Sequence, residues 1–246
     1  MSFNTGRRRA GAAVGLLCAS AFSAAAQTSV PRASKPPTSP SSAKTVPPMQ
    51  APKTYTYNLL RNGSPIGKHT MTIDQANGSV TIDQATDIEV KVVFVTAYKM
   101  HTQSHEVWNA DKFATFGSQT DDNGTKHKVD ATVDAKGAVT VVADGRRESL
   151  PVGALPSSFW TEQMMSAQHK AFFDPEKGTP QTLDITSVGH EPIKIAGQPF
   201  DSTHYHVAGT IERDVWFANG VPVRLQLKGS DGSTIVSELL PEPGVR

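Results

Sequence analysis

Histidine is the residue type through which this chain could most readily do chemistry, because imidazole binds metal ions and exchanges protons near neutral pH. Among its eight histidines, His204 and His206 flank Tyr205, and His101 and His105 lie four residues apart. On strands, the two members of each pair share a face. If the two strands were neighbours, the four imidazoles could together hold zinc or copper.

The alternative is that these histidines are ordinary, partly exposed strand residues. We favour it, because no cysteine and no tight carboxylate–histidine cluster accompanies them. His105-Glu106 and His190-Glu191 begin like the zinc-protease motif, but neither has a second histidine four positions after the first. The chain also has no serine nucleophile elbow, phosphate loop or dinucleotide-binding glycine pattern. We therefore expect no metal, no other cofactor and no catalytic residue, so the protein is not expected to be an enzyme.

Large, soft side chains offer a different kind of site. Aromatic residues and methionine line adaptable pockets for apolar ligands. The same side chains could instead simply fill the core, and the sequence leaves both interpretations open. The candidate ligand-binding residues are Phe94, Tyr98, Trp108, Phe159, Trp160, Met164 and Trp216.

Several of these candidates fall in one stretch, 156–170, which has apolar residues at helical spacing. Ser157 or Ser158 could cap the start of a helix there, and Glu162 would lie near the positive end of its dipole. We predict a single amphipathic helix that acts as a plug or as a lid. Its apolar stripe would be Trp160, Met164, Ala167 and Ala171.

The rest of the chain reads as antiparallel β-structure. Apolar and polar residues alternate between turn signals such as Asn77-Gly78, which favour tight hairpins. The run Val92-Val93-Phe94-Val95 is apolar on both faces, so we expect a fully buried strand that ends in a bulge or corner. The predicted fold is all-β: a curved half-barrel or open barrel of about a dozen strands, mainly an antiparallel meander, wrapped around the one central helix.

The beginning of the chain has the pattern of a secretory signal. Residues 7–9 are three arginines, 10–22 form a short apolar run, and Ala24-Ala25-Ala26 fits a cleavage site. We expect a signal peptide over 1–26, cleavage after Ala26, and a periplasmic location with no transmembrane anchor left. General secretion and twin-arginine export both remain open. The one cysteine, Cys18, would be lost with the signal.

Two segments would then remain. Residues 27–52 are rich in Pro, Ser and Thr and are expected to be a disordered linker, whereas 53–246 should form a single β domain. Three of the 24 Lys and Arg residues lie in the signal and three in the linker, so the domain has 18 basic against 23 acidic residues. This acidic balance argues against a nucleic-acid partner, which selects basic surfaces.

Five short motifs resemble those of one protein family: the segments 57–67, 94–98, 106–108, 120–124 and 215–217. The family consists of exported, periplasmic proteins of Gram-negative bacteria and is known only as a domain of unknown function. The resemblance implies an exported β protein, and it implies no activity.

These observations support three functions. The first is a non-enzymatic periplasmic protein that binds or carries an apolar or amphipathic ligand, a small molecule or a lipid. The second is a module that binds another envelope protein. The third is a metal-dependent enzyme that uses His101, His105, His204 and His206.

Overall fold

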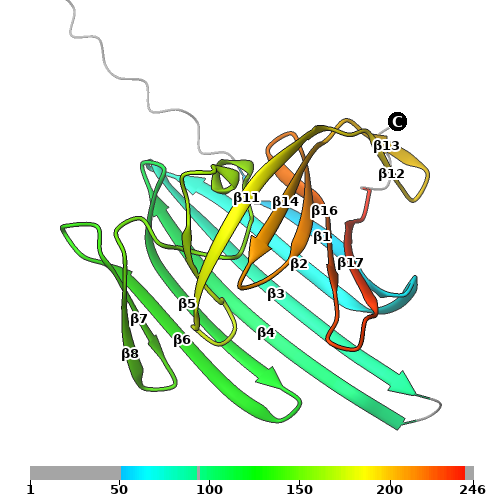
Figure 1. Ribbon diagram of the computed structural model, residues 1–246, viewed down its shortest axis with the longest axis horizontal. Coiled ribbons are helices and arrows are strands. Elements are labelled where there is room, and N and C mark those ends of the chain that lie inside the picture. The colour runs from blue at the N-terminus through cyan, green and yellow to red at the C-terminus, as the bar shows by residue number, and fades with distance from the viewer. Residues whose placement is uncertain (1–50, 93–94, 242–246) are drawn as a thin grey trace, which may run out of the picture. The chain divides into compact units, whose positions relative to one another are not determined.

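In the computed structural model, which describes residues 51–92 and 95–241, hydrogen bonds join fifteen strands into one sheet (Figure 1). Its first half is a meander of antiparallel hairpins that runs from the middle of the sheet to one edge. The strands of this half are β1 (Lys53–Arg61), β2 (Ser64–Ala76), β3 (Ser79–Val92), β4 (Val95–Asn109), β5 (Lys112–Asp122), β6 (Thr125–Val133), β7 (Val139–Ala143) and β8 (Arg146–Leu150).

The second half extends the sheet on the other side of β1. Its order is β1-β17-β16-β15-β14-β11-β10-β9, with every pair antiparallel except β9 and β10. A separate hairpin of two short strands, β12 (Ile193–Ile195) and β13 (Gln198–Phe200), follows β11. The other strands are β9 (Leu155–Pro156), β10 (Ala171–Phe173), β11 (Pro180–His190), β14 (Thr203–Gly209), β15 (Arg213–Ala218), β16 (Val221–Lys228) and β17 (Thr234–Leu239). The expected antiparallel all-β meander is confirmed, with seventeen strands in place of about a dozen among the described residues.

Asparagine–glycine pairs make the hairpins tight, as their sequence indicates. Asn77 (φ 54°) and Gly78 (φ 79°) connect β2 to β3 with both central residues in the left-handed region. That geometry matches the right-handed twist of the flanking strands, and Asn and Gly adopt it at the least steric cost.

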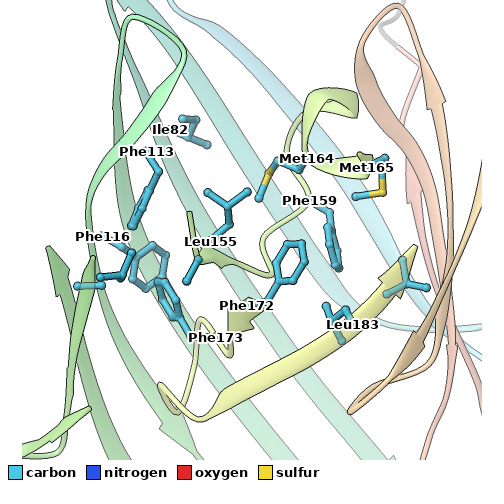
Figure 2. Close-up of a cluster of buried hydrophobic side chains, with 14 of the residues drawn as sticks. Ile82, Phe113, Phe116, Leu155, Phe159, Met164, Met165, Phe172, Phe173 and Leu183 are labelled. Atoms are coloured by element: carbon cyan, nitrogen blue, oxygen red, sulfur yellow. The ribbon is translucent and has the colours of Figure 1, made fainter. Parts of the chain in front are cut away.

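The main core lies on the concave face of the curved sheet (Figures 1 and 2). The chain between β8 and β11 occupies this face and buries Phe159, Met164, Phe172 and Phe173 almost completely. The Phe173 ring lies 5.4 Å from that of Phe116 on β5, so the far end of the sheet packs against its own first half through side chains. Burial of so many large rings is the main force that holds this segment in place.

The predicted central helix over 156–170 is wrong. The segment contains only one 3₁₀ turn, Glu162–Met165, and both flanking residues, Thr161 and Ser166, are extended. Phe159 has a φ of 45°, which interrupts any continuous helix, and no side chain caps the turn. Contacts of individual side chains with the sheet, rather than helical hydrogen bonds, therefore determine the path of this segment.

A second prediction also needs correction. Strand β3 ends at Val92, and β4 begins antiparallel to it at Val95, so the apolar run 92–95 is not one continuous buried strand. Phe94 lies outside the described residues. Within the described chain, no helix is long and apolar enough to cross a membrane.

Replacing Phe173 with alanine should lower the free energy of unfolding by about 3–5 kcal/mol, because the ring is fully buried and its loss leaves a cavity. Urea denaturation followed by circular dichroism measures the change. Val188→Ala is the control, since that side chain is 57% exposed and its truncation should change stability by no more than about 0.5 kcal/mol. Equal changes in the free energy of unfolding for the two substitutions would show that packing of the segment between β8 and β11 does not stabilise the core.

Candidate functional site

A cleft of about 670 Å³ opens where the β4–β5 turn, the β6–β7 turn and the chain after β8 meet. Its volume falls within the range of roughly 300–1,000 Å³ that small-molecule sites occupy. Buried apolar side chains form its base and charged side chains its rim. The base includes Trp108, Phe113, Val139, Ala154, Leu155 and Met164, and the rim includes Asp111, Lys112, Asp134 and Lys136.

Two residues before Trp108 on β4 lies Glu106, a carboxylate with no solvent exposure. Three side chains donate hydrogen bonds to it. The Trp108 indole N–H reaches Oε1 at 2.6 Å and that of Trp160 reaches the same oxygen at 3.2 Å, while the Ser158 hydroxyl reaches Oε2 at 2.9 Å. Glu106 therefore fixes the positions of both indoles.

These contacts join two parts of the chain that are far apart in sequence. Glu106 and Trp108 project from the same face of β4, whereas Ser158 and Trp160 belong to the segment between β9 and β10. The two indole rings meet edge to face, with centroids 5.7 Å apart. Trp108, which lines the cleft, is therefore held by Glu106 on its own strand and by the Trp160 ring of the segment between β9 and β10.

Burial and hydrogen bonding act in opposite directions on Glu106. Burial is the larger effect and raises its pKa from 4.5 to about 7, although the hydrogen bonds from Trp108, Ser158 and Trp160 each favour the ionised form. The side chain is enclosed and all three donors point at it. Its chemical role is therefore to position its neighbours, since a reacting molecule has no open path to it.

A further contact joins the 3₁₀ turn to β14, in the second half of the sheet. The Tyr205 hydroxyl on β14 donates to Glu162 Oε1 at 3.0 Å. Met164, in the same turn, is buried and lines the cleft. The position of Met164 thus depends on contacts with strands on both sides of the segment.

The structure brings together three of the predicted ligand-binding residues. Trp108 and Met164 line the cleft, and Trp160 shares the Glu106 carboxylate with Trp108. Phe159 lies in the core, where its ring centroid is 5.8 Å from that of Phe172.

The other predicted residues lie elsewhere. Tyr98 is ten residues before Trp108 on β4, near the far end of that strand, and donates to Asp122 Oδ1 at 2.9 Å. Trp216 lies on the opposite face of the sheet, in a second apolar cluster with Ile193 and Ile195 of the β12–β13 hairpin. Phe94 is outside the described residues.

The four histidines do not converge on one site. His101 and His105 lie on β4, whereas His204 and His206 lie on β14, and these strands are not neighbours in the sheet. The shared four-histidine site is therefore wrong. His101 Nδ1 and His105 Nδ1 each contact an exposed aspartate on β3 at 2.7 Å.

His204 has the richer environment of the two pairs. Its ring stacks on Trp216 with centroids 4.2 Å apart, and its Nε2 lies 3.0 Å from Asp214 Oδ1, which also contacts His206 Nδ1 at 2.9 Å. Its Nδ1 is 2.7 Å from Glu191 Oε2, close enough for an ion pair but not aligned for a hydrogen bond. Burial raises the pKa of Asp214, but the two histidines outweigh it and lower that pKa overall. Among the described residues, no group of three or more side chains has the arrangement of a metal site.

Glu106 is the residue that reasoning from the sequence missed. In the alternating run from Thr102 to Trp108, glutamate occupies a position on the same face as the buried Thr102 and Trp108. The placement of a charged residue on the apolar face of a strand, two positions before a tryptophan, was the available signal.

Fold and site together define an all-β protein in which residues 51–92 and 95–241 form one large, curved, mainly antiparallel sheet and a two-stranded one. The edge strands β8 and β9 of the large sheet do not pair with each other, and an apolar cleft lies at the β4–β5 turn, the β6–β7 turn and the loop after β8. The chain belongs to the family DUF6134, a domain of unknown function, whose family model matches residues 57–240. The resemblance to an uncharacterised family is thereby confirmed. A crystal structure described as a beta-barrel-like protein of the domain of unknown function DUF1849 from Brucella abortus is 13% identical, with a TM-score of 0.48, and the match covers 77% of this chain and 95% of that one. No curated protein matches the chain.

The pKa of Glu106 makes stability depend on pH. A carboxyl with a raised pKa binds its proton more tightly when folded, so its contribution is complete below pH 4.5 and is lost as the pH rises to about 7. The loss is on the order of 3 kcal/mol. Glu106→Gln places an amide oxygen and an amide nitrogen where the two carboxylate oxygens lie and cannot ionise, so its free energy of unfolding should lack this decline.

Urea denaturation of both proteins between pH 4 and 8 measures the difference. Glu106→Leu is the matched comparison, because it leaves two indole N–H groups and a hydroxyl without an acceptor and should be destabilised at every pH. Parallel pH profiles for the wild type and Glu106→Gln would contradict the assignment.

Proposed function

We propose that this protein binds an apolar or amphipathic small molecule, such as a lipid, in the cleft beside Trp108, and that it acts as a non-enzymatic binding or carrier protein. The observation that carries the proposal is the combination of volume and lining: about 670 Å³ over a buried apolar base. Burial of apolar ligand surface against such a base contributes roughly 25 cal/mol per Å² to binding.

The wall of the cleft supports binding of such a ligand. Trp108 offers a large aromatic surface whose orientation Glu106 fixes, so little side-chain freedom is lost when a ligand packs against it. Met164 offers a flexible, polarisable surface that adapts to ligands of different shape. The exposed rim carries two lysines and two aspartates, which suit a polar end of the ligand: Asp111, Lys112, Asp134 and Lys136.

The complete burial of Glu106 favours a binding role over catalysis. Glu106 is enclosed and accepts hydrogen bonds from three neighbours. General acid or base catalysis requires a group within hydrogen-bonding reach of the substrate. Trp108 lines the cleft, whereas Glu106 is not among the lining residues.

Substitution at Val152 tests the proposal, because this side chain lines the cleft and is 69% exposed. Val152→Asp should weaken the binding of the uncharged fluorophore N-phenyl-1-naphthylamine by about tenfold, since a charge then replaces apolar contact surface. Fluorescence titration measures the affinity. Val188→Asp is the matched control, because Val188 is also exposed but does not line the cleft, and it should leave the affinity unchanged.

Equal affinity of the two variants would refute the cleft as the binding site. Mass spectrometry of solvent extracts from protein purified out of its native cells would identify the bound molecule. Detection of no apolar or amphipathic compound in stoichiometric amount would count against a carrier role.

The proposed place of action is the periplasm, which the secretory pattern of residues 1–26 supports. Protein recovered from the periplasmic fraction should begin at Gln27, and N-terminal sequencing checks this. Ala26→Phe should block cleavage, because the signal peptidase needs a small residue at that position. A mature protein that still begins at Met1 would show that the segment is not a cleaved signal.

A further inference from the structure

Arg213 is a recessed cation on the concave face of the sheet. It begins β15, where Val215 and Phe217 at the alternate positions belong to the main core. Its Cζ atom lies 5.4 Å from the ring centroid of Phe159, over which the guanidinium is placed. Its Nε atom is fully enclosed and has no hydrogen-bond partner.

No carboxylate lies within ion-pair distance of this guanidinium in residues 51–92 and 95–241. The nearby acids, Asp174 and Glu176, belong to the turn between β10 and β11. The Oδ1 atom of Asp174 already accepts backbone N–H groups of Glu176 and Lys177, at 2.7 and 2.9 Å. Burial lowers the pKa of Arg213, although the charges of Asp174 and Glu176 act in the opposite direction, and burial likewise raises the pKa of Glu176.

Arg224 shows what a satisfied arginine looks like in the same sheet. Its Cζ lies 5.8 Å from the centroid of the Trp216 ring, so it also has an aromatic partner. It pairs in addition with Glu238, whose Oε1 lies 2.6 Å from Nη2, and Nη2 donates to a backbone carbonyl. Arg213 has the aromatic contact without the acid, and an incompletely paired cation in a recess costs several kcal/mol.

We propose that Arg213 binds the carboxylate of an amphipathic monocarboxylic acid, at a second site distinct from the cleft. The planar guanidinium suits bidentate recognition of a carboxylate. Across the ladder, Val207 is part of the buried core and Leu227 is partly exposed, so Leu227 is the apolar neighbour that an apolar ligand body could contact. Asp174 and Glu176 disfavour a group with two negative charges, so a carboxylate fits better than a phosphate.

The test uses the mature protein and three probes: decanoate, decan-1-ol and inorganic phosphate. In protein carrying Val152→Asp, which weakens binding in the cleft, calorimetric titration should show that decanoate binds and that the other two do not. Arg213→Met should weaken decanoate binding by at least about tenfold, because the charge-assisted hydrogen bonds are lost. Because Val152→Asp is present in every protein compared, binding in the cleft contributes equally little to each titration, and failure of the cleft proposal would not affect this result.

Thermal unfolding separates a ligand-binding arginine from a structural one. If Arg213 lacks a counter-ion without ligand, Arg213→Met should raise the Tm of the ligand-free protein by about 2–4 °C and abolish the further rise given by decanoate. Arg224→Met, the matched control, should lower the Tm because it leaves Glu238 unpaired, and it should keep the response to decanoate.

Three results would overturn the proposal. They are equal affinity of wild type and Arg213→Met for decanoate, a lower Tm for ligand-free Arg213→Met, and binding of inorganic phosphate as tight as that of decanoate.

Discussion

The contact between Glu106 and the segment that follows β9 is the interaction on which the rest of the structure depends. The concave face of an open sheet is largely apolar and must be covered. Here the covering segment has almost no regular structure of its own, with one 3₁₀ turn in the fifteen residues 156–170. Hydrogen bonds from Ser158 and Trp160 to a carboxylate on β4 fix its position, and the apolar side chains around them supply the stabilising energy.

The end of the sheet at β10 contacts β5, in the first half of the sheet, through side chains rather than through a ladder of backbone hydrogen bonds. Phe173 on β10 packs against Phe116 on β5, Ser118 donates to the carbonyl oxygen of Pro175, and Lys177 pairs with Asp122 at 2.9 Å. All of these contacts join the last strands of the sheet order to its first half. Because no ladder joins β10 to β5, a small change in the distance between these strands costs less free energy than breaking a row of backbone hydrogen bonds would.

Local features of this fold could be predicted from the sequence, and non-local ones could not. The Asn-Gly pairs determine hairpins through their own backbone preferences, so the meander was predictable. The periodic apolar residues in 156–170 predict a helix, but here the same spacing occurs in a segment without a continuous helix. Trp160 and Met164 face the core for another reason: strands far away in sequence hold the segment from both sides.

In the candidate site, too, local features could be predicted from the sequence and non-local ones could not. Trp108 and Met164 were recognisable from residue type, whereas the only local signal for Glu106 was its place on the apolar face of a strand. Its hydrogen-bond partners Ser158 and Trp160 lie more than fifty residues later, and the pattern does not show them. Trp216 was placed in the same site because the pattern does not show which face of the sheet it occupies. Both faces are apolar at β15, since the β12–β13 hairpin covers the side opposite the main core.

An open sheet also has to manage its two edges, and the way it does so explains where the cleft lies. Strand β8 exposes Arg146, Arg147 and Glu148 at one edge, and such charges discourage pairing with another strand. The other edge, β9, is only two residues long and contains Pro156, which has no N–H to donate. Loop residues between these two strands, Val152 to Ala154, line the cleft. The cleft therefore lies where the two edges of the sheet are joined by a loop instead of a ladder, and the lack of pairing between β8 and β9 leaves the space that forms the cleft.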